Sequence, residues 1–235
     1  MLARVVAALA ASGAIARIVV VGVEACPEAD QAIRGSAGAL HYLPNTGNLY
    51  DNAIQGLSAL AADQDGQRHA LLTSADVPLL TGESVGHFLQ VCAPYDQDVY
   101  WGIVAREVME AAFPESRRTY LGLVEGEFCN GELYLVRIAA ALQRRELLRE
   151  LVEMRKHVLR QALRLGPGVL LRLLLRRLRM QDAVGVAWRT LRLHGTPVIL
   201  PFAESGMDVD KPHQLAQVEA YLQAKAAAAR QDAHA

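Results

Sequence analysis

The sequence predicts an α/β domain with a mostly parallel sheet and helices on both faces, and three stretches carry this prediction. Residues Ile18–Val23 are almost all β-branched, which suits a strand buried on both faces, as in parallel sheets. Residues Leu49–Ala61 have apolar side chains at helical spacing, and Ala70–Thr73 form a short apolar run bounded by turn signals. Helices that alternate with buried strands are typical of α/β domains.

The other expected elements continue this alternation along the chain. Helices are expected at Met1–Ala11, Pro27–Ala37, from Thr81 onward and at His213–Ala226, and strands at Leu40–Leu43, Asp98–Val104, Thr119–Val124, Glu132–Arg137 and Pro197–Leu200. Thr81 begins a near capping box, with Ser84 in place of the usual Glu. Asn130–Gly131 fits a turn before the following strand, and it is also a candidate substrate contact.

Composition limits the classes of protein that fit. The chain has 235 residues, 52% of them hydrophobic, which is enough for one large domain with a sizeable core. A net charge of -1 argues against a protein that binds nucleic acid through its overall charge. Cys26, Cys92 and Cys129 fit neither a disulfide framework nor a zinc pattern, which favours a reducing, cytoplasmic compartment. Arginines interrupt every long apolar run, so we expect no transmembrane helix.

Asp76 is the first candidate site residue. It follows the apolar run Ala70–Thr73 closely, and Pro78 then stops strand pairing because proline has no N–H to donate. Ligands of open α/β sheets bind beyond the carboxyl ends of the strands, so this carboxylate is placed for a site. Aspartate before a proline-containing turn also acts as a turn cap, and position alone leaves both interpretations open.

A second acidic stretch precedes the last helix. Asp208 and Asp210 lie in this loop, and Pro212 suits the first helical position. If the fold brings Asp76 and Asp210 together, they could hold Mg²⁺, which favours one or two carboxylates plus substrate phosphates. Such an ion would neutralise charge on a triphosphate and help to align it for in-line attack.

Asn48 and Asn52 are candidates for two different roles. Asn48 fits the N-cap of the helix Leu49–Ala61, and Asp51 in its first turn is favoured by the helix dipole. The start of a helix that faces the same sheet edge can also hold an anion or a base. The sequence therefore leaves open whether these asparagines shape the loop or contact a nucleotide.

Residues 139–185 are expected to form a Leu- and Arg-rich helical insert, which Gly166-Pro167-Gly168 divides in two. Its basic residues are Arg144, Arg145, Arg149, Arg155, Lys156, Arg160, Arg164, Arg172, Arg176, Arg177 and Arg179. Three interpretations compete: a packed subdomain with solvated arginines, a cradle for an anionic substrate, and a basic amphipathic helix on a membrane surface. The basic run contains no interleaved aromatic residues, which argues against a platform for single-stranded nucleic acid.

Three segments together resemble a known group of enzymes: MLARVVAALAASGAIARIVVVG, LLTSADVPLL and GMDVDKPHQLAQVEAYL. They are similar to the first helix and second strand, the metal-binding Asp-x-Pro and the closing Asp-x-Asp-x-Pro of nucleotidyltransferases. GNLYDNAIQGLSAL resembles, more loosely, the helix that borders their nucleobase pocket. Within this group the chain is most similar to the MobA-like (molybdenum-cofactor nucleotidyltransferase-like) NTP transferases.

The resemblance implies a Rossmann-like domain of the glycosyltransferase-A, or nucleotide-diphospho-sugar transferase, type. It also implies a transfer of NMP from an NTP to a small-molecule acceptor, with Mg²⁺ as cofactor and pyrophosphate as the second product. The roles that it implies are metal ligands for Asp76 and Asp210, with Asp208 as a less favoured substitute, nucleotide contacts for Asn48, Asn52 and Ser74, and a border of the acceptor site for Asn130 and Gly131.

The chain departs from this family at its beginning. The family has a Gly-rich loop with a basic residue between its first strand and first helix, whereas Met1 falls inside the matching helix. On this comparison about 20–30 residues of a βαβ unit are missing, including a central strand. We therefore expect residues 1–235 to be one N-terminally incomplete domain with low stability and little activity. The alternative function is a non-catalytic binding module for a phosphorylated or lipid-linked partner.

Overall fold

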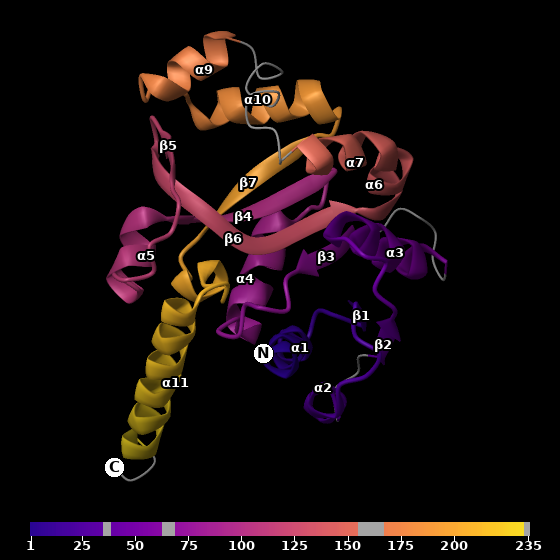
Figure 1. The fold of residues 1–235 in the computed structure, drawn as a ribbon, viewed down its shortest axis with the longest axis vertical. Coiled ribbons are helices and arrows are strands. Elements are labelled where there is room, and N and C mark those ends of the chain that lie inside the picture. Colours follow the sequence, from indigo (N-terminus) through magenta and orange to yellow (C-terminus); the bar gives the residue numbers. More distant parts are fainter. Residues whose placement is uncertain (35–38, 63–68, 155–166, 233–235) are drawn as a thin grey trace.

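The computed structural model describes residues 1–34, 39–62, 69–154 and 167–232 (Figure 1). The helices are α1 (Leu2–Ala11), α2 (Pro27–Ala32), α3 (Leu49–Ala61), α4 (Gly82–Cys92), α5 (Arg106–Ala112), α6 (Ile138–Gln143), α7 (Arg145–Met154), α9 (Pro167–Leu174), α10 (Met180–Leu191), the 3-10 helix η1 (Ala203–Gly206) and α11 (Pro212–Asp232). The strands are β1 (Arg17–Val21), β2 (Ala39–Leu43), β3 (His69–Thr73), β4 (Val99–Ala105), β5 (Leu121–Leu123), β6 (Gly126–Arg137) and β7 (Gly195–Leu200). The predicted α/β architecture is confirmed.

The strands form two sheets in the described part of the chain. The larger sheet has the order β3-β6-β4-β7, with β5 paired to β6, and β1 and β2 form a separate parallel pair. Strands β3 and β4 both run antiparallel to β6, and β7 runs parallel to β4. Three of the four main strands therefore share one direction, and β6 runs between them in the opposite direction.

Helices cover both faces of the larger sheet, as the sequence predicts. Successive residues of a strand point to opposite faces. In β6, Leu135 belongs to a core cluster that also contains α1 and α4 residues, such as Val6 and Phe88. Its neighbour Val136 belongs to a second cluster, together with Leu57 of α3. The two faces are thus packed by different helices.

Local capping explains where the well-predicted helices begin. The Asn48 side chain accepts a hydrogen bond from the Asp51 backbone N–H at 2.8 Å, which places Asn48 at the N-cap of α3. At the start of α4, Thr81 and Ser84 form a reciprocal capping box, so serine replaces the usual glutamate.

The structure corrects the predicted turn at Cys129–Gly131. These residues lie inside β6, which runs unbroken from Gly126 to Arg137. The register with β4 shifts between Trp101 and Ile103, so β6 contains an irregularity rather than an end.

The sequence also gives no signal for α5, and α10 extends the helical insert to Leu191. The predictions for Arg155, Lys156, Arg160, Arg164 and Gly166 lie outside the described residues.

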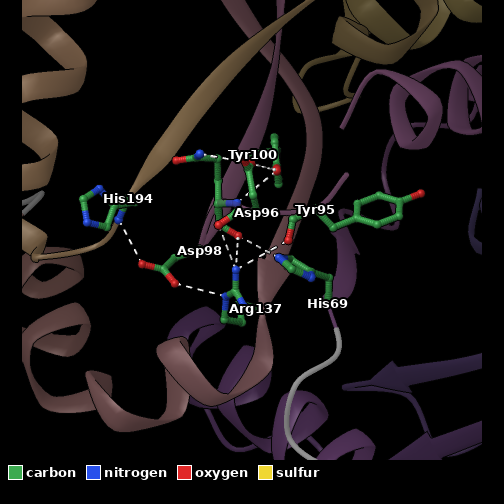
Figure 2. A network of polar contacts seen from close by, with 8 residues as sticks. His69, Tyr95, Asp96, Asp98, Tyr100, Arg137 and His194 are labelled. Atoms are coloured by element: carbon green, nitrogen blue, oxygen red, sulfur yellow. Dashed lines mark hydrogen bonds and ion pairs between the residues drawn. The ribbon is translucent and has the colours of Figure 1, made fainter. Parts of the chain in front are cut away.

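A polar network closes the end of the sheet where β3 and β4 begin (Figure 2). Arg137, paired in register with His69, forms an ion pair with Asp98 at 3.2 Å and donates to the carbonyl of Asp96 at 2.9 Å. The backbone N–H of His194, just before β7, donates to the other oxygen of Asp98 at 3.0 Å. The network joins β4, β6 and β7 at this end, and it leaves the opposite end for a site.

No described helix is both long enough and apolar enough to cross a membrane. All three cysteines are free, and burial raises the pKa of the Cys92 thiol to about 12. A thiol of this kind stays protonated and behaves as a small apolar group.

Two residues of α4 test how much of the stability comes from the core between this helix and the sheet. Phe88 is fully buried, whereas Val91 on the same helix is 49% exposed. We expect Phe88→Ala to lower the free energy of unfolding by about 3–5 kcal/mol, because it leaves a cavity. Val91→Ala is the control and is expected to change it by less than about 0.5 kcal/mol. Urea denaturation measures both, and equal effects would contradict the packing described here.

Candidate functional site

One backbone hydrogen bond joins the end of β3 to the loop before α11. The N–H of Val209 donates to the carbonyl oxygen of Asp76 at 2.9 Å. Val209 lies between Asp208 and Asp210, so the two acidic segments are held against each other although they are far apart in the sequence. The backbone segments that carry Asp76 and Asp210 therefore lie side by side, and a shared ion between their carboxylates stays a prediction.

The end of β3 carries two buried oxygens that have no partner among the described residues. They are Oγ1 of Thr73, the last residue of β3, and Oδ1 of Asp76. A buried carboxylate oxygen without a donor is costly, and bound cations commonly satisfy such groups. This buried oxygen is consistent with the predicted role of Asp76 as a metal ligand, which stays a prediction.

The loop around Asp210 is arranged by a buried glutamine. The side-chain oxygen of Gln214 accepts from the backbone N–H groups of both Asp210 and Lys211 at 2.9 Å, and Gln214 is only 5% exposed. Gln214 thus satisfies the two amides that precede α11. The Asp210 carboxylate accepts no hydrogen bond from a described residue and is exposed.

Asp208 differs from the other two aspartates because a cation already engages it. Its carboxylate forms an ion pair with Arg118, and the two side chains are only 17% and 10% exposed. Arg118 comes from the loop between α5 and β5. This ion pair already compensates the charge of Asp208, and the order of the predicted metal ligands stays a prediction.

Glu132 is a fourth acid at this site, and the sequence analysis did not identify it. Thr73 and Leu133 are the last register pair of β3 and β6, so Glu132 lies just beyond the end of β3, beside Asp76. Its carboxylate accepts from the side-chain amide of Asn130 at 2.5 Å. Its backbone has φ +49°, a left-handed conformation that is uncommon for glutamate and frequent at functional sites.

Burial and neighbouring charges shift the pKa of Glu132. Burial raises the pKa of its carboxyl group most, the Asp76 charge raises it next, and Asp210 raises it further. Arg118 and the hydrogen bond from Asn130 act in the opposite direction. We call Asp76, Glu132, Asp208 and Asp210 the acidic cluster. Its members come from the end of β3, the irregularity in β6 and the loop before α11.

Gly131 allows β6 to pass close to β4 at this site. A Cβ atom on Gly131 would lie 2.9 Å from the carbonyl carbon and 3.0 Å from the oxygen of Gly102, both of them backbone atoms. The same segment also contacts η1, because a Cβ on Gly206 would lie 3.2 Å from the Asn130 carbonyl oxygen. Asn130 and Gly131 therefore position the acidic cluster, whatever contact they make with a substrate.

Two of the three predicted nucleotide-binding residues, Asn48 and Asn52, lie where a separate hydrogen-bonded loop joins α3. Asn48 caps α3, and Oδ1 of Asn52 accepts from both the backbone N–H and the hydroxyl of Thr46, at 2.8 and 2.7 Å. Neither asparagine hydrogen-bonds to the acidic cluster within the described residues. Ser74 directly follows β3 and is half-buried. The capping role of Asn48 is established by these contacts, and contact of the three residues with a nucleotide stays a prediction.

The carboxylates of Asp76 and Asp210 fit one type of metal site. In the described part of the chain, no group of three or more His, Cys, Asp and Glu side chains is arranged to hold an ion by itself. Mg²⁺ usually keeps several waters and takes one or two carboxylates plus substrate phosphates, so it does not need such a cage. Asp76 and Asp210 supply the number of carboxylates that Mg²⁺ uses in this type of site.

Replacement of Glu132 by glutamine should change how stability depends on pH. Because the folded-state pKa of Glu132 is raised, its contribution to stability is fully present below the ordinary glutamate pKa of 4.5 and is lost as the pH rises through the folded value. Glu132→Gln keeps the oxygen that Asn130 binds and removes the charge. We expect the variant to gain stability relative to the parent as the pH rises toward neutrality, as measured by thermal unfolding. A constant difference across this range would contradict the environment described for Glu132.

Two glycines form a matched pair that tests the close approach of β6 and β4. We expect Gly131→Ala to destabilise the fold by about 1–3 kcal/mol, because the added methyl group meets backbone atoms that cannot rotate away. Gly86 lies in α4, and no atom lies within 4 Å of the place that an added methyl group would occupy, so Gly86→Ala should instead stabilise slightly. Chemical denaturation of both variants separates the close approach from a general intolerance of substitution.

Comparison with solved structures identifies two related folds. A hypothetical transferase from Thermus thermophilus is 33% identical, with a TM-score of 0.77, over 92% of this chain and 85% of that one. A 4-diphosphocytidyl-2C-methyl-D-erythritol synthase is 12% identical, with a TM-score of 0.55, over 94% of this chain and 89% of that one. No protein-family model and no curated protein matches the chain.

The two similarities support different conclusions. At 12% identity the synthase shows only a shared fold, of the Rossmann-like nucleotidyltransferase type that the sequence predicts. The Thermus thermophilus protein is similar enough in sequence and coverage to establish kinship. Neither comparison names the narrower MobA-like group. The chain belongs to the family of the hypothetical transferase from Thermus thermophilus.

Proposed function

We propose that this protein is a Mg²⁺-dependent nucleotidyltransferase that moves an NMP from an NTP to a phosphorylated or other small-molecule acceptor. The acceptor oxygen forms a bond to the α-phosphorus, the bond between the α-phosphorus and the bridging oxygen breaks, and pyrophosphate leaves. One observation carries the proposal: the hydrogen bond from Val209 to Asp76 joins the segments that carry Asp76 and Asp210, at the end of the sheet where β3 ends. Ligands of such sheets bind at this end.

The residues of the site have separate tasks in this proposal. Asp76 and Asp210 hold the ion, since Asp76 has a buried oxygen without a described partner and no described residue donates to the Asp210 carboxylate. When bound, Mg²⁺ neutralises charge on the triphosphate and helps to align it for in-line attack. Asn130, Gly131 and Glu132 border the acceptor position. Asn48, Asn52 and Ser74 contact the nucleotide in this proposal.

The narrower MobA-like assignment is part of the same proposal. It rests on the order of the Asp-x-Pro segment at Asp76 and the Asp-x-Asp-x-Pro segment that ends at Pro212. The contact between these segments supports their use as one site.

We also propose that the active sheet contains a further strand between β1 and β3, followed by a Gly-rich phosphate-binding loop. Within the described residues β1 pairs only with β2, and β3 pairs only with β6, so each has one edge without a strand partner. A strand that pairs with both edges would unite the two sheets and cover unpaired N–H and C=O groups. The loop after it would hold the triphosphate through backbone N–H groups.

Carboxylate substitutions test the transferase proposal directly. We expect Asp76→Asn and Asp210→Asn each to lower Mg²⁺-dependent pyrophosphate release from a mixture of NTPs and phosphorylated acceptors by roughly a hundredfold or more. Glu219→Gln, which changes an exposed acid on α11, is the control and should leave the rate unchanged. NTP binding by calorimetry separates the alternative: a non-catalytic binding module would bind equally well with and without Mg²⁺ and would be indifferent to Asp76→Asn.

The strand proposal has its own test. A form extended at its N-terminus by a strand and a Gly-rich loop should unfold at a higher urea concentration and release pyrophosphate much faster than residues 1–235. The reason is that the extension pairs two open sheet edges and supplies phosphate donors. Robust turnover by the 235-residue chain alone would refute this part and leave the carboxylate assignment intact.

A further inference from the structure

The end of α9 exposes a row of leucines. Leu171, Leu174 and Leu175 are 60%, 83% and 56% exposed. They are spaced three and four residues apart, and the N–H of Leu175 donates to the Leu171 carbonyl at 3.0 Å, so they share one side of a helical turn. Leu178, only 4% exposed, turns into the protein a few residues later. We call the three exposed side chains the leucine patch.

Arginines surround the leucine patch, and the acids close to it are already engaged. Arg172 pairs with Asp182 at 3.3 Å, and Arg176 pairs with Glu127 at 3.7 Å. Arg172 and Arg176 nevertheless remain 60% and 79% exposed, so their charges still face solvent. Arg177 is exposed and forms no ion pair with a described residue. The surface therefore combines an apolar row with a positive border.

The body of the protein holds this surface in place. The Val124 N–H donates to the Leu178 carbonyl at 2.9 Å, and the Met180 N–H donates to the carboxylate of Glu125 at 2.9 Å. These bonds attach the segment between α9 and α10 to the β5–β6 turn. Figure 1 shows α9 at the outer end of the molecule, on the opposite side of the large sheet from α1 and α2. The leucine patch is thus presented at an extremity, where a flat surface can reach it.

We propose that the leucine patch docks this protein on the surface of an anionic lipid bilayer, with the leucines in the interfacial region and Arg172, Arg176 and Arg177 among the headgroups. Apolar side chains bordered by Arg and Lys are characteristic of segments that lie in a membrane interface. The arginines add attraction to acidic lipids. The contact is peripheral, since no described helix can cross a membrane.

A protein partner fits these residues less well. Energetically dominant contacts between proteins are enriched in Trp, Tyr and Arg, and leucine is under-represented among them. The leucine patch has no aromatic side chain, and its leucines lie on a protruding helical turn instead of in a pocket. Val91 and Leu215 are also exposed apolar residues, and they lie on other helices.

Vesicle sedimentation with the full chain tests the proposal. The protein is mixed with phosphatidylcholine vesicles, with or without phosphatidylglycerol, at equal total lipid. We expect binding to the vesicles that contain phosphatidylglycerol, weaker binding to phosphatidylcholine alone, and a loss of binding as salt is added. The combined variant Leu171→Ser, Leu174→Ser, Leu175→Ser should bind about tenfold more weakly or worse, because apolar burial is lost at unchanged net charge.

The matched control is the double variant Val91→Ser, Leu215→Ser, which removes exposed apolar groups elsewhere and should bind like the parent. Circular dichroism confirms that each variant is folded. No sedimentation of the parent with any vesicle would overturn the proposal, as would equal binding by the leucine variant. Light scattering tests a third outcome, in which the parent forms a dimer that the leucine variant does not form. Such a dimer, together with no vesicle binding by the parent, would overturn the proposal and assign the leucine patch to contact between two copies of the chain.

Discussion

The hydrogen bond between Val209 and Asp76 is the contact on which the functional interpretation depends. It joins two segments that are far apart in the sequence, and both segments carry carboxylates. Like charges gathered in a partly buried place repel one another, so the folded chain must compensate them. Arg118 compensates Asp208, and Asn130 donates to Glu132. Asp76 and Asp210 remain without such a partner among the described residues, and the proposed Mg²⁺ would compensate their charge.

The geometry of β6 serves this arrangement. A regular strand would continue the alternation through Asn130, Gly131 and Glu132, and it would place their side chains on successive faces. The register shift and the left-handed backbone of Glu132 turn its carboxylate toward the cluster. The cost of this conformation is of order 1–3 kcal/mol, and the surrounding close packing of Gly131 on Gly102 maintains it. The polar network around Arg137 fixes the other end of the same strand (Figure 2).

The sequence predicts best the features that local interactions determine. The starts of α3 and α4 follow from Asn48 and Thr81 with the residues just after them, and β1 follows from its β-branched run. The place of Asp76 after β3 was predictable for the same reason. The unbroken course of β6 was not, because it depends on a close approach to β4 that only the folded chain reveals. Glu132 resembles any polar residue of an alternating strand, and the partner of Arg118 lies 90 residues away. Neither residue has a local signature that could have identified it.

The central claim is that Asp76 and Asp210 share one divalent cation with a nucleotide. Electron paramagnetic resonance with Mn²⁺ in place of Mg²⁺ tests it most directly, in the parent, in Asp76→Asn, in Asp210→Asn and in the double variant. The account predicts one Mn²⁺ bound in the presence of NTP, weakened by each substitution, with a non-additive effect in the double variant because both residues bind the same ion. Unchanged Mn²⁺ affinity in either single variant, or strictly additive losses, would contradict it.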